Sequence, residues 1–398
     1  MNKNLQCKKL STKRERKHEQ KFAKQIIVCH NYIMDREWLI NKLIESVGSK
    51  KTNIIQFSKG YDINRFLFVE LKNRLFEAFP SYHIVEVKQE EDILSFIPSL
   101  KEISFKNPVI VLINDVFSYK NPEAIINSFY GFDNISAFIT TDADVSYQLG
   151  KKDTLVRGRY NRFFLPPALF GDSSKIENIN YCDLFSFGSY SKQASKIYSY
   201  ILNHSGELLS YRKIHEGIGK TLSIGKTIDI VDYMINHFLF YRLFRVDVSK
   251  NKNISSGFIC YPTHINNLDK IPCSNEKKYF LKTATAVVAR MVYNGFGVKK
   301  AISYFYETKD GKRVRTEFDR GFLVFNFDKR VIINIRLDED GNDIEKLIKF
   351  KSNIPHLIGL PGNSEYIMDC NGLTYVGIEK ILGNGLGEYG GIQKKKGN

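Results

Sequence analysis

The sequence contains no apolar run long enough to cross a membrane. A transmembrane helix needs about 18 or more mostly apolar residues, and no such stretch occurs among the 398 residues. The N-terminal segment is polar and basic, unlike the hydrophobic segment of a secretion signal. From these absences we expect no membrane association and a cytoplasmic location.

The cysteines lack any pattern that is typical of a metal site or a disulfide framework. The six cysteines are scattered, none forms a C-x-x-C pair, and none has zinc-ligand spacing to the eight histidines. We therefore expect reduced thiols and no metal-binding cluster.

The chain has too few acidic residues to balance its basic ones. It carries 59 Lys and Arg against 43 Asp and Glu, which gives a formal charge of +16 at pH 7. Such a field attracts nucleic acid or acidic protein surfaces, so nucleic acid or another protein is the expected partner. The alternative interpretation is that a Lys- and Asn-rich composition reflects drift in the source genome and indicates no partner.

Apolar segments typical of strands alternate with helical segments over the first half of the chain. This alternation predicts a mostly parallel sheet covered by helices on both faces. The predicted strands are Thr52–Phe57, His83–Val87, Pro108–Asp115, Ile135–Thr141 and Phe163–Phe170, and the predicted helices are Asp35–Ile44, Asn64–Phe79, Glu90–Leu100 and Pro122–Tyr130.

Composition shifts divide the chain into five parts. A basic flexible arm (1–25) precedes the sheet domain (26–175). Helix, helix–turn–helix and hairpin signals over 190–250 predict a winged-helix domain, and Ser249–Lys278 is predicted to be a loop. An α/β domain (279–383) and a flexible Gly- and Lys-rich tail (384–398) follow.

The loop after the first strand is where a phosphate-binding loop would lie. A phosphate loop of the form G-x-x-x-x-G-K-[ST] uses backbone amides at a helix start to hold phosphates. The sequence there is FSKGYDINRFLF, which keeps one glycine and lacks the lysine and hydroxyl of that motif. It is either a modified nucleotide site or a degenerate connecting loop. The candidate nucleotide-binding residues are Ser58, Lys59, Gly60, Asn64 and Arg65, together with Thr141 after the fourth strand.

The third strand ends on a single carboxylate. Asn114-Asp115 follows a run of apolar residues, and an ATPase needs two carboxylates there, one for Mg²⁺ and one for the attacking water. Asp115 is therefore the candidate catalytic residue, with Arg159 as a candidate sensor or finger for a γ-phosphate. The alternative is that Asp115 is a helix cap and Arg159 pairs with local acids.

Four features recur in a recognisable order. They are the DREWLI helix, the strand–loop–helix at Thr52–Phe79, the VLIND strand, and Gly158-Arg159 followed by an apolar strand and a Pro-Pro corner. In this order they resemble the prokaryotic AAA-type "ATP-binding protein" family. The resemblance implies a P-loop NTPase-like α/β core, a winged helix and a small α+β restriction-endonuclease-like domain, with ATP and Mg²⁺ as cofactors where the motifs are intact.

The resemblance also implies a nuclease-like site in the C-terminal domain. Such nucleases place an Asp on one strand and [Glu/Gln]-x-Lys on the next, so that carboxylates hold Mg²⁺ and lysine helps to activate water. Here Asn334 is a weak metal ligand and Arg336 cannot release a proton. We expect a remnant without cleavage activity, formed by Glu317, Asp319, Asn334 and Arg336.

The predicted third helix of the winged helix offers candidate DNA contacts. Ser223, Lys226 and Thr227 lie near its N-terminus, the part that enters a major groove. Asp229 and Asp232 on the same helix would repel phosphates. The alternative is an intramolecular lid that packs on the ATPase-like core.

Three functions follow from these patterns. The first is a nucleotide-responsive regulator, the second is a scaffold that keeps the fold with no or weak ATP hydrolysis, and the third is a DNA-binding protein that uses the winged helix and the basic surface. The missing phosphate-loop groups favour an inactive enzyme, because losing even one charge-stabilising group costs about 10²-fold or more in rate.

Overall fold

The structure is a computed structural model. It describes residues 36–57, 63–87, 93–156, 158–165, 190–248, 252–293, 296–307, 313–317, 320–325, 330–335, 356–360, 367–368, 374–377 and 381. These divide into two compact units, one formed by residues 35–200 and 211–241 and the other by residues 201–210 and 242 onward. Each unit is considered separately below.

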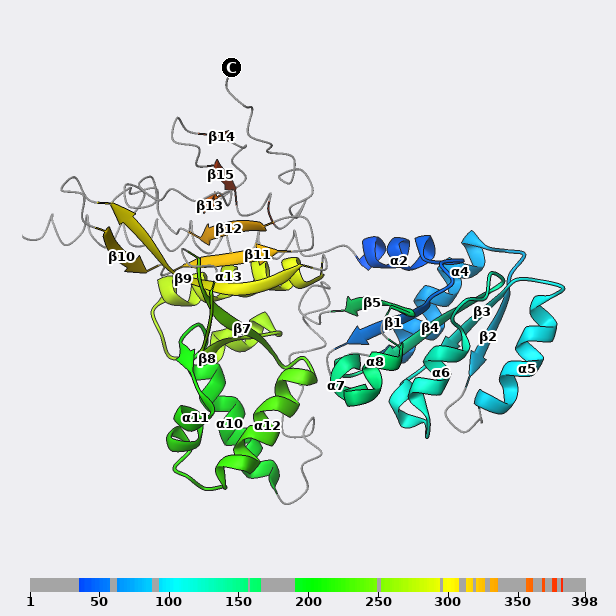
Figure 1. Cartoon of the computed structure of the whole chain (residues 1–398), viewed down its shortest axis with the longest axis horizontal. Coiled ribbons are helices and arrows are strands. Elements are labelled where there is room, and N and C mark those ends of the chain that lie inside the picture. The colour runs from blue at the N-terminus through cyan, green and yellow to red at the C-terminus, as the bar shows by residue number, and fades with distance from the viewer. Residues whose placement is uncertain are drawn as a thin grey trace, which may run out of the picture. The chain divides into compact units, whose positions relative to one another are not determined.

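The first unit is built on a five-stranded parallel sheet in the order β2-β3-β4-β1-β5 (Figure 1). Every pair of neighbouring strands is parallel. The strands are β1 (Thr52–Phe57), β2 (His83–Val87), β3 (Val109–Ile113), β4 (Ile135–Thr141) and β5 (Tyr160–Leu165). The predicted parallel sheet is present, and it is compatible with a P-loop NTPase-like core.

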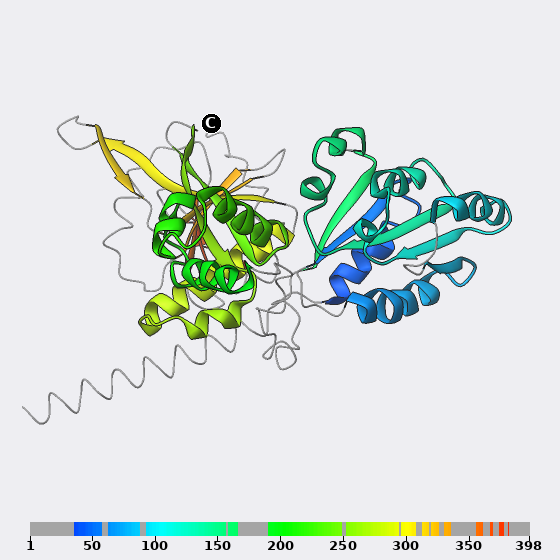
Figure 2. The ribbon, with the colours of Figure 1, turned by 90° about the horizontal axis from the view of Figure 1, so that it is seen from below.

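Helices cover both faces of this sheet, as Figures 1 and 2 show. The connection from β1 to β2 runs along one face, where its helix packs against α2. The connections from β2 to β5 return along the other face, as right-handed crossovers require when the direction of travel reverses. The first face carries α2 (Arg36–Glu45), α3 (Ile63–Arg65), the π-helical η1 (Phe66–Leu71) and α4 (Lys72–Ala78), and the second carries α5 (Ile93–Ser104), α6 (Pro122–Ser128), α7 (Val145–Leu149) and α8 (Asp153–Val156).

Burial on both faces explains why the central strands are mostly apolar and carry no charged residue. Every residue of β1, β3 and β4 is buried, which is the expected state of parallel strands between two helix layers. On the face of α5 and α6, strand residues such as Ile54, Val111 and Ile139 join one apolar core with Ile97 and Ile126. The buried polar Thr52 is satisfied because its hydroxyl donates to the Ile126 carbonyl oxygen at 2.7 Å.

Three helices and part of a strand complete the first unit. The elements are α10 (Ser191–Asn203), α11 (Tyr211–Gly217), α12 (Ile224–Asn236) and the start of β7 (Phe240–Asp247). Gly217 is required where α11 passes α10, because a Cβ at this position would lie 2.0 Å from the Tyr200 ring. The order of these elements matches the winged-helix prediction, which stays a prediction.

The second unit contains a larger mixed sheet, in the order β14-β15-β13-β12-β11-β9-β7-β8-β6 with β10 paired to β9. The long helix α13 (Asn275–Tyr293) contacts β8, β9 and β12. The strands are β6 (Leu208–Leu209), β8 (Lys252–Pro262), β9 (Gly297–Glu307), β10 (Arg313–Glu317), β11 (Gly321–Phe325), β12 (Arg330–Ile335), β13 (His356–Leu360), β14 (Ile367–Met368) and β15 (Thr374–Gly377), and a 3-10 helix, η6, spans Ile265–Lys270.

The predicted loop at Ser249–Lys278 is wrong. The segment contains β8, η6 and the first turn of α13. Its Asn, Ser and Gly residues are typical of loops, but Gly257 lies within β8 and has a different role there. Its φ is +79°, and a Cβ there would lie 2.5 Å from the Leu209 carbonyl oxygen, so the strand needs glycine to pass β6 closely.

Truncating the buried ring of Phe138 should destabilise the first unit strongly. Phe138 is fully buried in the central strand β4, and Phe→Ala changes in a core cost about 3–5 kcal/mol because they leave a cavity. The matched control is Phe76→Ala on α4, where the ring is 62% exposed and the expected change is within about 0.5 kcal/mol. Urea unfolding of both variants measures the difference, and equal midpoints would contradict this placement of β4.

The second unit should lose stability as the pH falls towards 4. His264 is 4% exposed, and burial lowers the pKa of its imidazole to about 4. The folded chain therefore stays neutral at His264 between pH 6.5 and about 4, while the unfolded chain takes up a proton. Stability is complete above pH 6.5 and falls by about 3 kcal/mol over this window.

The variant His264→Leu should show a smaller loss of stability between pH 7 and pH 4.5, measured as the change in urea midpoint within each protein. The exposed His83→Leu is the control and should keep the wild-type loss. An undiminished loss in His264→Leu would rule out this group as the source.

Candidate functional site

The topology of the first unit creates one switch point, between β1 and β4. The chain leaves β1 along one face of the sheet and leaves β4 along the other, although these strands are hydrogen-bonded neighbours. In open α/β sheets, ligands bind outside the carboxyl ends of the strands at such a point. The side chains that gather there are therefore the candidate site.

Four residues from three segments form a continuous polar chain at this switch point. The Asn114 amide nitrogen donates to the Asn64 side-chain oxygen at 2.7 Å. The Thr140 hydroxyl donates to the Asn114 side-chain oxygen at 2.6 Å and accepts the Asp115 backbone N–H at 2.9 Å. We call Asn64, Asn114, Asp115 and Thr140 the switch-point chain.

The switch-point chain also fixes the backbone at the end of β3. Asp115 has a φ of +48°, in the left-handed region that few residues other than glycine adopt. The Asp115 carbonyl oxygen accepts the Ser118 hydroxyl at 2.7 Å, and its N–H is held by Thr140. These contacts offset the cost of the unusual conformation, which is on the order of 1 kcal/mol or more.

Two other predicted nucleotide-binding residues, Arg65 and Thr141, have contacts of their own. Arg65 is paired with Glu70 at 3.5 Å on the same helical segment. Thr141 is fully buried, and its hydroxyl contacts the backbone of Ala143 at 3.3–3.4 Å. Ser58, Lys59 and Gly60 lie outside the described residues.

Arg159, the candidate sensor or finger, does not lie beside Asp115 within the chain. Arg159 comes directly before β5, whereas Asp115 comes after β3, and the strands are parallel. The two residues therefore lie at opposite ends of the sheet, about 20 Å apart by the length of a six-residue strand. Arg159 instead donates to the Asn127 side chain and lies over the Tyr130 ring, 5.5 Å from its centroid.

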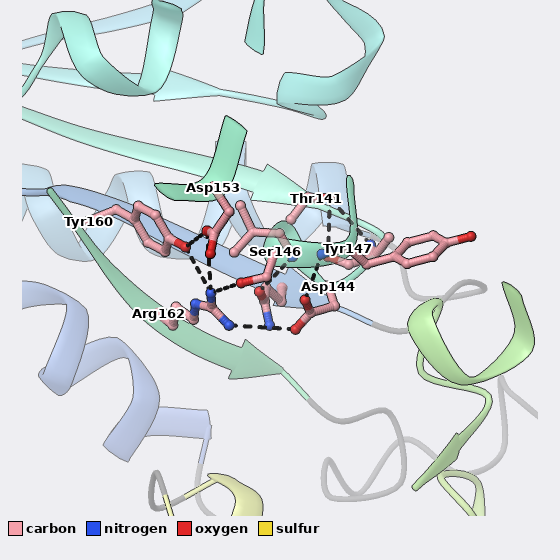
Figure 3. A network of polar contacts seen from close by, with 10 residues as sticks. Thr141, Asp144, Ser146, Tyr147, Asp153, Tyr160 and Arg162 are labelled. Atoms are coloured by element: carbon pink, nitrogen blue, oxygen red, sulfur yellow. Dashed lines mark hydrogen bonds and ion pairs between the residues drawn. The ribbon is translucent and has the colours of Figure 1, made fainter. Parts of the chain in front are cut away.

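A second polar cluster, which the sequence did not reveal, is built around Arg162 on β5 (Figure 3). The guanidinium donates to the Ser146 hydroxyl and to the Tyr160 hydroxyl, the latter at 2.7 Å, and lies 3.6 Å from the Asp144 carboxylate. The Tyr160 hydroxyl in turn donates to the buried Asp153 carboxylate at 2.7 Å, and burial raises the pKa of Tyr160. This cluster joins α7 and α8 to the edge strand.

The segment after β4 also contacts the end of α12. The Asp144 N–H donates to the Asn236 carbonyl oxygen at 2.7 Å. The His237 side chain is buried, stacks on Tyr233 with 3.9 Å between ring centroids, and places its Nδ1 3.1 Å from the Asp142 carbonyl oxygen. The helical part of the first unit is thus tied to the edge of the sheet that carries the switch-point chain.

Two of the three candidate DNA contacts on α12 have structural roles. Thr227 is fully buried, and its hydroxyl donates to the Ser223 carbonyl oxygen at 3.1 Å. Ser223 is the N-cap of α12, where its hydroxyl accepts the Lys226 N–H at 3.2 Å. Lys226 lies 4.9 Å from the centroid of the Tyr190 ring.

Glu317 and Asn334, the two nuclease-like residues that the structure describes, do not lie on neighbouring strands. Glu317 ends β10, which pairs with β9, whereas Asn334 lies on β12, which pairs with β11 and β13. Asp319 and Arg336 lie outside the described residues.

Within the described ranges, no group of three or more His, Cys, Asp or Glu residues is placed to hold a metal ion. The same part of the chain contains no helix with the length and apolar character needed to span a membrane.

Comparison with known proteins identifies no family. No family model matches the chain, and no curated protein matches it. Among solved structures, a chain of the Drosophila ORC bound to AT-rich DNA and Cdc6 is 10% identical, with 61% of this chain and 91% of that chain covered and a TM-score of 0.25. Saccharomyces cerevisiae RIF2 is 13% identical, with 54% and 94% covered and a TM-score of 0.25. Likenesses this weak carry no argument about function.

Removing one hydroxyl should test the switch-point chain. Thr140→Val keeps the volume of the side chain but leaves the Asp115 N–H and the Asn114 oxygen without their partner. Unsatisfied groups of this kind cost about 1–3 kcal/mol, which urea unfolding would measure. Thr221→Val, at an exposed position, is the matched control and should change stability by less than about 0.5 kcal/mol. Equal stability of the two variants would show that the hydrogen bonds of the switch-point chain do not form.

Proposed function

We propose that this protein is a divergent AAA-type scaffold or regulator with no or weak ATP hydrolysis. The parallel sheet supplies the core, and the switch-point chain takes the position that a nucleotide and its metal ion would need. The protein acts through partners bound to its surfaces rather than through chemistry at the sheet edge.

The observation that carries this proposal is the mutual bonding of Asn64, Asn114 and Thr140. The position of a phosphate-loop lysine is best matched by Arg65 or Asn64, and the Asn64 side-chain oxygen accepts a hydrogen bond from the amide of the strand-end residue Asn114. The Asn114 oxygen is bonded to Thr140. A ligand at this crevice would have to break these contacts before gaining its own, which disfavours binding.

The described residues do not fit a magnesium-bound nucleotide. Asp115 follows β3 and Asp142 follows β4, and the Asp142 carboxylate lies 3.5 Å from the His237 Nδ1. The side chains that join the segments there are amides and a hydroxyl. Mg²⁺ prefers carboxylate, phosphate and water oxygens in octahedral geometry, and phosphoryl transfer requires a cation to neutralise the developing charge. No catalytic step through such a group is derived for this chain.

Two other functions receive less support. A DNA-binding surface on α12 would have to rely on Lys226, because Ser223 caps the helix and Thr227 is buried. A nuclease would need Glu317 and Asn334 to meet, and their strands do not pair.

A thermal-shift titration with ATP and Mg²⁺ tests the proposal. A ligand that binds the folded state stabilises it by about 2.7 kcal/mol at a hundredfold excess over its dissociation constant, which would raise the melting temperature by roughly 5–10 °C. We expect a shift below about 1 °C and no measurable release of phosphate. Robust hydrolysis that is lost in Asp115→Ala would contradict the proposal, and Lys120→Ala, at an exposed position past the same strand end, controls for a general effect of substitution.

A further inference from the structure

The edge of the sheet opposite the switch-point chain carries a continuous surface of its own. Four loops or helix ends lie side by side there because each directly precedes one of the adjacent strands β3, β4, β1 and β5. Backbone bonds tie them together, from Val109 N–H to the Asn134 oxygen at 2.8 Å and from Thr52 N–H to the Arg159 oxygen at 3.1 Å. We call residues 48–51, 101–107, 130–134 and 158–159 the amino rim.

Aromatic rings stand exposed on the amino rim. Phe105, directly after α5, is 85% exposed, and Tyr130, after α6, is 44% exposed. Single exposed apolar residues are ordinary, but here both rings occur on neighbouring loops of one edge. Phe105 is almost fully exposed, whereas the Tyr130 ring is partly exposed and has the Arg159 guanidinium over it.

Basic side chains outnumber acidic ones on the amino rim. It contains the five basic residues Lys50, Lys51, Lys101, Lys106 and Arg159 against the two acidic residues Glu102 and Asp133. Arg159 lies over the Tyr130 ring at 5.5 Å, and the Lys101 amine lies 4.6 Å from the centroid of the Phe132 ring. Lys50 and Asp133 pair with each other at 2.6 Å, which leaves four basic residues against one acidic residue.

We propose that the amino rim binds single-stranded nucleic acid. Exposed rings stack on unpaired bases, and a basic groove or edge follows the phosphates. Together these two features are the typical equipment of proteins that bind single strands without sequence preference. The three spacings between these four strands place the rim elements over about 14 Å, enough for a few nucleotides. This inference does not depend on whether a nucleotide binds at the switch point.

The rings decide between possible partners. A duplex hides its bases, so exposed rings would add nothing to its binding, and an acidic peptide would use the lysines without stacking on Phe105 and Tyr130. Only an unpaired strand engages the rings and the cations together. DNA and RNA share this chemistry, and the two are distinguished by the experiment.

Fluorescence anisotropy of the full chain with labelled oligo(dT) and oligo(U) of about 12 nucleotides tests the proposal. We expect binding of at least one of them that weakens about 20-fold between about 50 and about 200 mM salt, as expected for roughly three neutralised phosphates. Phe105→Ala and Tyr130→Ala should each weaken binding by on the order of tenfold. The double variant Lys51→Ala, Lys106→Ala should weaken binding and flatten the salt dependence.

Matched variants separate the rim from other basic parts of the chain. Phe76→Ala on α4 is 62% exposed and controls for loss of an exposed ring, and Lys120→Ala controls for loss of an exposed lysine. Both should bind as the wild type does, and all variants should keep the wild-type melting temperature. Ultraviolet crosslinking should map the oligonucleotide to peptides that contain Phe105 or Tyr130.

Three results would overturn the proposal. One is unchanged affinity in the ring variants, which would place any binding elsewhere. Another is a duplex of the same length binding as tightly as the single strand. The third is a labelled polyglutamate peptide that binds more tightly than either oligonucleotide and is indifferent to the ring variants.

Discussion

The common direction of five buried strands is the constraint on which the first unit depends. Because all neighbouring pairs are parallel, residues that directly follow a strand lie at the carboxyl edge of the sheet. Residues that directly precede a strand lie at the amino edge. Residues that are close in sequence can then be a full strand length apart, and residues from distant segments can touch. For this reason Asn64, Asn114 and Thr140 contact one another, and Arg159 lies at the opposite edge of the sheet.

The two edges that result have opposite chemical characters. At the carboxyl edge the switch-point chain and the contacts of Asp142 and Asp144 with the end of α12 bond polar groups to one another. Satisfied polar networks of this kind rigidify the parts they join. At the amino edge, rings and cations face solvent instead. Polar groups that bond to one another rigidify the carboxyl edge, whereas exposed rings and cations leave the amino edge available to bind a partner.

Much of the sheet could be predicted from sequence, and the failures have identifiable causes. The bounds of β1, β2 and β4 agree residue for residue with the predicted strands. β1 and β4 are buried along their whole length, whereas β2 is an edge strand with exposed residues, so the β-branched and aromatic residues of all three, rather than burial alone, identify them. Arg159 precedes both the predicted strand Phe163–Phe170 and the observed β5, whereas Asp115 follows β3. The parallel direction of the strands, rather than their exact bounds, therefore separates the two residues. The Ser249–Lys278 segment was predicted to be a loop from its loop-typical residues. The strand there forms because it pairs with strands that lie elsewhere in the sequence, which the local residues do not reveal.

The site was harder to predict than the fold, since side-chain orientation is not a property of sequence order. The pattern Asn114-Asp115 drew attention to the carboxylate, but the amide beside it makes the two side-chain bonds that join the segments. Nothing local to Asn114 indicates this role, because one partner lies 50 residues before it and the other 26 residues after it. Arg162 was missed for a similar reason, since its partners come from α7 and α8, before its own strand.

The main stabilisation of the first unit comes from its apolar core rather than from its edges. The apolar residues of the sheet and its helices supply it, because burial of apolar area is the largest favourable term in folding, and those residues lie between the edges rather than at them. At the carboxyl edge, the side chains of Asn64, Asn114 and Thr140 bond to one another, so these polar groups have partners within the protein. Under the proposed function, this internal bonding is what allows the core to be stable without a nucleotide.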